Sequence, residues 1–172
     1  RGRKRGNRSV IRAVFFDLGD TLMPEEGNAK TLPHAREVLQ ELKSKYRLAV
    51  ICNATVATEK HVREILRGAG IEEFFDAVVV STDVGYRKPD EGIFRIALEK
   101  LALRAEEVVM VGNRLSTDIL GGNRLGMKTV LIRCSKRYPE KATCELEQPT
   151  YIIHSLRELL PIIHELGQKK LT

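Results

Sequence analysis

The stretch that decides the fold is FFDLGDTL, residues 15–22, which continues an apolar run beginning at Ile11. The run is rich in β-branched and aromatic residues and ends at a glycine turn signal, which predicts a buried strand over Ile11–Phe16. Asp17 then stands at the carboxyl end of that strand, where open α/β sheets bind ligands. Asp17 is therefore a candidate nucleophile or magnesium ligand, although Asp and Gly also favour plain turns.

Apolar strands and amphipathic helices alternate along the rest of the chain. Further strands are predicted at Leu48–Ile51, Ala77–Val80, Val108–Val111, Thr129–Ile132 and Tyr151–Ile153. One intervening helix is expected to be capped by Ser116 and to stop at Gly126, and the last follows Ser155, with a kink or late start caused by Pro161. The fold class is therefore α/β, a three-layer, doubly wound, Rossmann-like and mainly parallel sheet.

Length and composition are those of one globular domain. The 172 residues are 42% hydrophobic and 30% charged. We expect a basic flexible tail over residues 1–10, a single α/β domain over 11–166 and a C-terminal tail over 167–172. The formal net charge of +6 owes much to that basic tail, so it suggests nucleic acid or membrane contact only weakly and only there.

Two further features bear on the compartment. No apolar run approaches the ~20 residues that a membrane-spanning helix needs. The three cysteines show neither a zinc pattern nor a disulfide framework, which favours a reducing, cytoplasmic compartment.

Polar side chains gather where the predicted strands end. Right-handed crossovers bring the carboxyl ends of parallel strands to one edge of the sheet, so residues that follow different strands become neighbours. The candidates at this edge are, in chain order, Asp17, Asp20, Cys52, Asn53, Lys88, Asn113 and Asp118. Carboxylate, amide and ammonium groups in such a cluster suit a phosphate ester and a magnesium ion.

The order and spacing of these residues resemble the haloacid dehalogenase (HAD) superfamily, whose members are mostly phosphatases. The resemblance covers about Ile11 to Ile163, and its most specific stretches are residues 88–90 (KPD) and 112–127. It implies a HAD-like domain that transfers a phosphoryl group to an aspartate. Such an intermediate splits one difficult hydrolysis into two easier displacements.

The resemblance also implies roles for individual residues. Asp17 would attack phosphorus and become a phosphoaspartate, and Lys88 would neutralise charge on Asp17 and on the transferring group. The implied Mg²⁺ ligands are Asp17, the backbone carbonyl of Gly19, Asn113 and Asp118. The implied phosphate-binding residues are Cys52, Asn53 and Lys88. Asp118 has an alternative interpretation as a carboxylate stabilised by a helix N-terminus.

The first motif departs from the family pattern at its acid/base. Most members carry an aspartate two residues after the nucleophile, where it protonates the leaving group and later activates water. Gly19 occupies that position here, and Asp20 follows one residue later. Alternating side chains would aim Asp20 elsewhere unless the loop is irregular, so Asp20 is the candidate acid/base only in an irregular loop.

Two other positions also depart from the pattern. Cys52 stands where the family usually has a phosphate-binding Ser or Thr, and a thiol is only a weak donor. Cys52 is equally well interpreted as a small buried hydrophobe. Asn113 replaces the usual metal-binding aspartate, so the site has one negative charge fewer and we expect weaker Mg²⁺ affinity.

Neither gap between the motifs holds the helical cap domain of many family members. Residues 18–32 separate Asp17 from the first predicted helix, and residues 54–87 separate Asn53 from Lys88. By the resemblance, uncapped members tend to use large substrates, such as a phospholipid or a polymer end, or to oligomerise so that a neighbour covers the site. The candidate substrates are thus a phosphorylated small molecule, a lipid or a macromolecule, and a homo-oligomer could cover the opening. The compact length also looks like the bacterial phosphatidylglycerophosphate phosphatases, but their paired-aspartate first motif is absent.

Two functions from different classes remain open. The first is a Mg²⁺-dependent phosphatase that hydrolyses a phosphate monoester through a phosphoaspartate. The second is a catalytically reduced HAD-like protein that binds a phosphorylated ligand or protein partner. Dehalogenase or phosphonatase chemistry is a third class. By the resemblance, members with those activities also lack the acid two residues after the nucleophile, and a halide leaving group needs no proton.

Overall fold

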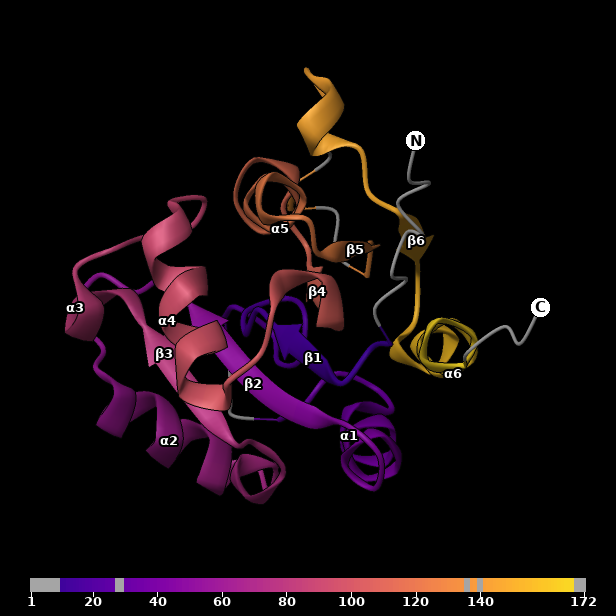
Figure 1. Ribbon diagram of the computed structural model, residues 1–172. Helices are drawn as coiled ribbons and strands as arrows, with labels where there is room; N and C mark the ends of the chain where they lie inside the picture. The colour runs from indigo at the N-terminus through magenta and orange to yellow at the C-terminus, as the bar shows by residue number, and fades with distance from the viewer. Residues whose placement is uncertain (1–9, 27–29, 135–136, 139–140, 169–172) are drawn as a thin grey trace, which may run out of the picture.

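The protein contains a six-stranded parallel sheet in the order β3-β2-β1-β4-β5-β6 (Figure 1). The computed structural model describes residues 10–26, 30–134, 137–138 and 141–168, so nearly all of the predicted basic tail, and residues 169–172, lie outside it. The strands are β1 (Ala13–Phe16), β2 (Arg47–Cys52), β3 (Ala77–Val80), β4 (Val108–Gly112), β5 (Lys128–Ile132) and β6 (Tyr151–Ile153). The predicted parallel α/β fold is confirmed.

Helices cover both faces of the sheet and make three layers (Figure 1). One face carries α1 (Ala35–Lys43), α2 (Glu59–Gly68) and α6 (Leu159–Gly167). The other carries α4 (Glu91–Leu101) and α5 (Leu120–Leu125), and the single-turn α3 (Ser81–Val84) follows β3 directly. The short 3₁₀ turns are Glu72–Phe74, Ala105–Glu107, Glu145–Glu147 and Leu156–Glu158.

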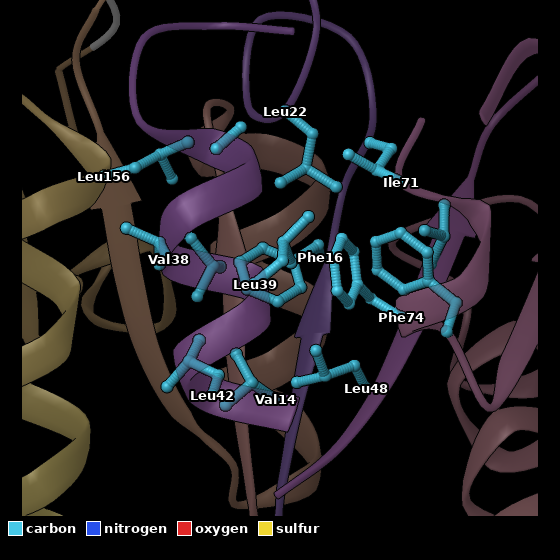
Figure 2. Packing of buried hydrophobic residues seen from close by; sticks show 14 of the residues in the cluster. Val14, Phe16, Leu22, Val38, Leu39, Leu42, Leu48, Ile71, Phe74 and Leu156 are labelled. Carbon is cyan, nitrogen blue, oxygen red and sulfur yellow. The ribbon is translucent and has the colours of Figure 1, made fainter. Parts of the chain in front are cut away.

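Strand β1 lies at the centre of the core and is buried on both faces. Its side chains alternate, so Val14 and Phe16 join the cluster under α1 while Phe15 joins the cluster under α4. Figure 2 shows Phe16 beside Leu39 of α1 and near Phe74, and Val14 beside Leu42 of α1. Such two-sided burial explains why parallel strands are apolar at every position rather than at alternate ones.

The segment around Ser116 differs from the expectation. Ser116 does not cap the helix: a π-helical turn, Leu115–Ile119, follows Arg114 and leads into α5. The backbone amides of Asp118 and Ile119 both donate to the Arg114 carbonyl, at 3.1 and 3.2 Å, and the Asp118 carboxylate accepts the Arg114 amide. The turn is therefore widened around a buried carboxylate, which helical periodicity does not reveal.

The last helix starts late, as Pro161 predicted. A 3₁₀ turn follows Ser155, and α6 begins at Leu159, so that Pro161 lies in the first helical turn. The missing amide of proline costs no hydrogen bond there because the first amides of a helix have no partner within it.

No separate cap domain is present among the residues that the structure describes. Within the same residues, every helix is too short or too polar to cross a bilayer. In the part of the chain that the structure describes, loops that leave the strands cover the carboxyl edge of the sheet.

The contact between α4 and α5 gives a test of the packing. A Cβ on Gly121 would lie 2.3 Å from the buried ring of Phe94, so we expect Gly121→Ala to lower the free energy of unfolding by about 1–3 kcal/mol. Gly68→Ala is the matched control, because a Cβ there meets nothing within 4 Å and should be neutral or slightly stabilising. Urea denaturation measures both, and equal stability of the two variants would contradict the packing.

Candidate active site

A single buried lysine connects the ends of three neighbouring strands. The Nζ of Lys88, from the loop before α4, lies 2.8 Å from Oδ1 of Asp17 after β1 and 2.8 Å from Oδ1 of Asp118 beyond β4. It also donates to the Ile51 carbonyl of β2 at 2.7 Å. The Lys88 side chain is 2% exposed. The ammonium group therefore has acceptors from β1, β2 and the turn after β4.

Burial and charge shift the pKa values of this cluster. Burial alone would lower the pKa of Lys88, but the carboxylates of Asp118 and Asp17 outweigh it and raise that pKa. Burial is the main cause that raises the pKa of Asp118, and the charge of Asp17 adds to it, against the opposing effect of Lys88. Lys88 faces two carboxylates, whereas Asp118 faces one ammonium and one like charge. The cluster therefore holds its lysine charged.

The loop after β2 is tied to the lysine loop through Asn53. The Asn53 side chain accepts the backbone amide of Lys88 at 2.7 Å and donates to the Lys88 carbonyl at 3.0 Å. Ser81 at the end of β3 holds the next residue, because its hydroxyl accepts the Ala54 amide and donates to the Ala54 carbonyl. These bonds use the side chain of Asn53, so its phosphate contact stays a prediction that would involve the backbone amide.

A pocket of about 510 Å³ opens in front of this cluster. Of the predicted site residues, those that line it are Asp17, Gly19, Cys52, Asn53, Lys88 and Asn113. Asp20 and Asp118 do not line it. Residues from four separate loops therefore share one pocket, as the edge of a parallel sheet predicts.

Asp20 does not line the pocket, and its carboxylate contacts Glu25 and Arg137. The residue has a left-handed backbone (φ 53°), and its amide donates to the Met23 carbonyl at 2.6 Å. One carboxylate oxygen accepts the Glu25 amide at 3.1 Å, and the other lies 3.2 Å from Nε of Arg137. The loop is irregular, as the acid/base hypothesis required, but its geometry favours Asp20 as the residue that shapes the loop.

Asp118 is set apart from the pocket by burial. Its side chain is 1% exposed, and its second oxygen accepts the Arg114 amide at 3.2 Å. A Cβ on Gly112 would lie 2.3 Å from its Cγ, so glycine is required where the carboxylate packs on β4. Its predicted contact with magnesium stays a prediction, while its contact with Lys88 is direct.

Cys52 faces the pocket as a neutral thiol. Burial, chiefly, raises its pKa to about 11, despite the nearby charge of Lys88. A thiol with so high a pKa is a poor nucleophile at neutral pH. Cys52 therefore contributes shape and a weak donor to the site.

Several pocket residues carry charge or a hydroxyl and were given no role from the sequence: Glu25, Thr55, Arg87, Arg114, Thr117 and Tyr138. Tyr138 donates to Glu25, with Oη at 3.3 and 3.2 Å from its two carboxylate oxygens. The Arg114 guanidinium lies 4.3 Å from the centre of the Tyr138 ring. Tyr138 falls in a polar stretch whose composition predicts only a surface loop, so no local pattern predicts its place at the site. Glu25 could have been found as the next acidic residue after Asp20.

The pocket offers oxygen donors that suit a magnesium ion. The carboxylate of Asp17, the amide of Asn113 and the backbone of Gly19 all line it. No cluster of three or more His, Cys, Asp or Glu side chains able to hold a metal occurs within the described part of the chain. A bound ion would therefore depend on amide and carbonyl oxygens beside Asp17, which hard cations accept.

A family model described as haloacid dehalogenase-like hydrolase matches residues 14–132. The chain belongs to this family. The HAD-like likeness extends to solved structures: a HAD hydrolase of Bacillus subtilis, YfnB, described as bound to magnesium, superposes with a TM-score of 0.76 at 18% identity, over 90% of this chain and 99% of that one. At that identity the likeness shows a shared fold alone.

Two curated relatives are named for different substrates. A glyceraldehyde 3-phosphate phosphatase of Methanothermobacter thermautotrophicus is 42% identical over 104 residues, which are 60% of this chain and 45% of that protein. The pyrophosphatase PpaX of Bacillus mycoides is 33% identical over 132 residues, 76% of this chain and 59% of that protein. This HAD-like chain thus spans about half the length of the curated relatives it matches.

Removing the buried ammonium should destabilise the fold. Lys88→Met leaves two carboxylates without their counter-charge, so we expect the free energy of unfolding to fall by about 3–5 kcal/mol. Adding Asp118→Asn removes one of those charges and should recover part of the loss.

Lys43→Met is the matched control for the lysine. Lys43 pairs with Asp76 at 2.7 Å, but both side chains are partly exposed, so the expected loss is about 0–1 kcal/mol. Chemical denaturation measures all three variants. A double variant no more stable than Lys88→Met would contradict the electrostatic account.

Proposed function

We propose that this protein is a phosphatase that hydrolyses a phosphate monoester through a phosphoaspartate on Asp17. The observation that carries the proposal is the 2.8 Å contact between Asp17 and the buried Lys88 at the wall of the pocket. An attacking carboxylate must approach an anionic phosphate, and a fixed ammonium offsets that repulsion. Relatives with phosphatase names support the same reaction class.

Each pocket residue has a separate role in the first displacement, the transfer of the phosphoryl group to Asp17. Among the described residues, the partners of the Asp17 carboxylate are Lys88 and, at 3.4 Å, the Thr21 hydroxyl, so its second oxygen is available to attack. Lys88 fixes the rotamer of Asp17 and lowers the charge at the site of attack. The Asn53 backbone and the Cys52 thiol lie beside Lys88 on the pocket wall, where the phosphoryl oxygens would bind.

Magnesium is the cofactor that this donor set would hold. The ligands would be Asp17, the carbonyl of Gly19 and the amide oxygen of Asn113, with Asp118 close behind through Lys88. When bound, the ion would offset negative charge on the phosphoryl group. Family membership supports this cofactor.

The pocket suits a substrate that is not enclosed by a cap. Arg87 and Arg114 line it together with Lys88, which favours an anionic, phosphorylated ligand. A phosphorylated small molecule, a lipid or a macromolecule could enter from solvent, and a second copy of the chain could cover the opening. The relatives' printed substrates differ from one another, so the substrate of this chain is a separate question.

A second function is a HAD-like protein that binds a phosphorylated ligand or protein without turnover. Gly19 favours this alternative, because it removes the carboxylate from the usual acid/base position. The carboxylate of Asp20 does not replace it in the pocket.

Turnover of p-nitrophenyl phosphate separates the two functions. We expect Mg²⁺-dependent hydrolysis that EDTA abolishes, and Asp17→Asn should reduce it to background because the nucleophile is lost. Asp83→Asn is the matched control, since Asp83 is exposed and lies outside the pocket lining. Wild-type turnover no higher than that of Asp17→Asn, with retained phosphate binding, would favour the binding function.

A further inference from the structure

We propose that Glu25 is the acid/base of this site, a role that rests on the proposed phosphatase function. Gly19 leaves the usual position without a side chain, and Glu25 lies over it. A Cβ built on Gly19 would lie 3.4 Å from Cγ and 3.5 Å from Cβ of Glu25. Glu25 and Asp17 line the same pocket. Glu25, six residues after Gly19, thus supplies the carboxylate that Gly19 lacks.

Neighbouring side chains orient the Glu25 carboxylate. The Tyr138 hydroxyl lies 3.3 and 3.2 Å from its two oxygens, and Nε of Arg137 lies 3.6 Å from one of them. The Glu25 side chain is 42% exposed, so it remains in contact with solvent water. An acid/base needs a fixed direction and access to water, and a position in the pocket would bring it to the leaving group.

Asp20 acts as a positioning residue for Glu25. Its carboxylate accepts the Glu25 backbone amide at 3.1 Å and also pairs with Arg137, whose Nε lies near Glu25. Because the carboxylate is at residue 20 rather than at residue 19, it does not line the pocket and instead holds the backbone of the loop. This hydrogen bond from the Glu25 amide to Asp20 helps to hold Glu25 at the pocket.

The proton transfers balance over two displacements. In the first, the bond from an Asp17 oxygen to phosphorus forms as the bond to the leaving oxygen breaks, and the Glu25 carboxyl gives that oxygen its proton. In the second, the Glu25 carboxylate takes a proton from water as the water oxygen bonds to phosphorus. The Asp17–phosphorus bond then breaks, inorganic phosphate leaves, and Glu25 is protonated again.

Glu25→Gln tests this role, with Glu26→Gln as the matched control. Glu26 is adjacent, 77% exposed, and pairs with the same Arg137, but it does not line the pocket. With an alkyl phosphate, whose leaving group needs a proton, we expect kcat of Glu25→Gln to fall by about 10²–10⁴-fold. With p-nitrophenyl phosphate, we expect a burst of about one p-nitrophenol per enzyme and then slow turnover, because only the second displacement needs the base.

Adding Gly19→Asp to Glu25→Gln should restore alkyl phosphate turnover, since a side chain at residue 19 meets Glu25 only at ordinary contact distance. Thermal unfolding confirms that each variant folds. If Glu25→Gln matches Glu26→Gln, or loses both substrates equally without a burst, the role of Glu25 is overturned while the phosphatase function stands. A wild type without Asp17-dependent turnover overturns both.

Discussion

Burial of one ammonium group, that of Lys88, is the constraint on which the site depends. A buried charge is costly unless it is paired, and here the pairing comes from Asp17, Asp118 and the Ile51 carbonyl. Asp17 follows β1, Asp118 follows β4 and Ile51 lies in β2, and these three strands are neighbours in the sheet. The parallel sheet with this strand order brings them to one point, so the chemistry of the site depends on the fold.

The strands could be predicted from the sequence because each is buried on two faces. Such strands are apolar at every position and end at polar residues, as at Phe16 and Asp17, and this pattern needs no knowledge of distant contacts. The neighbourhood of Asp17, Lys88 and Asn113 followed for the same reason, since parallel strands share one carboxyl edge. The π-helical turn before α5 could not be predicted from the sequence, because it depends on the contacts of the buried Asp118 with Lys88 and the Arg114 amide.

The rest of the pocket could not be predicted because it depends on contacts between distant loops. Tyr138 and Glu25 are 113 residues apart and meet only once β5 brings its following loop across the sheet edge. Local spacing places Asp20 beside Asp17 in the motif, yet the left-handed backbone at Asp20 turns its carboxylate towards Arg137. Sequence position thus identified the motif and Asp17, but not whether the carboxylate of Asp20 reaches the pocket.

The charges of the Asp17, Lys88 and Asp118 cluster give a reason for a neutral residue at position 113. Asp17 and Asp118 carry two negative charges against one positive charge on Lys88, so a further aspartate beside them would increase the repulsion of an anionic phosphate. Asn113 supplies an oxygen donor to the pocket without that charge. As a magnesium ligand, Asn113 would weaken the attraction for a divalent cation and the repulsion of an anionic substrate together. A bound phosphate would supply the negative charge that Asn113 lacks, so cation and substrate should bind more tightly together than either does alone.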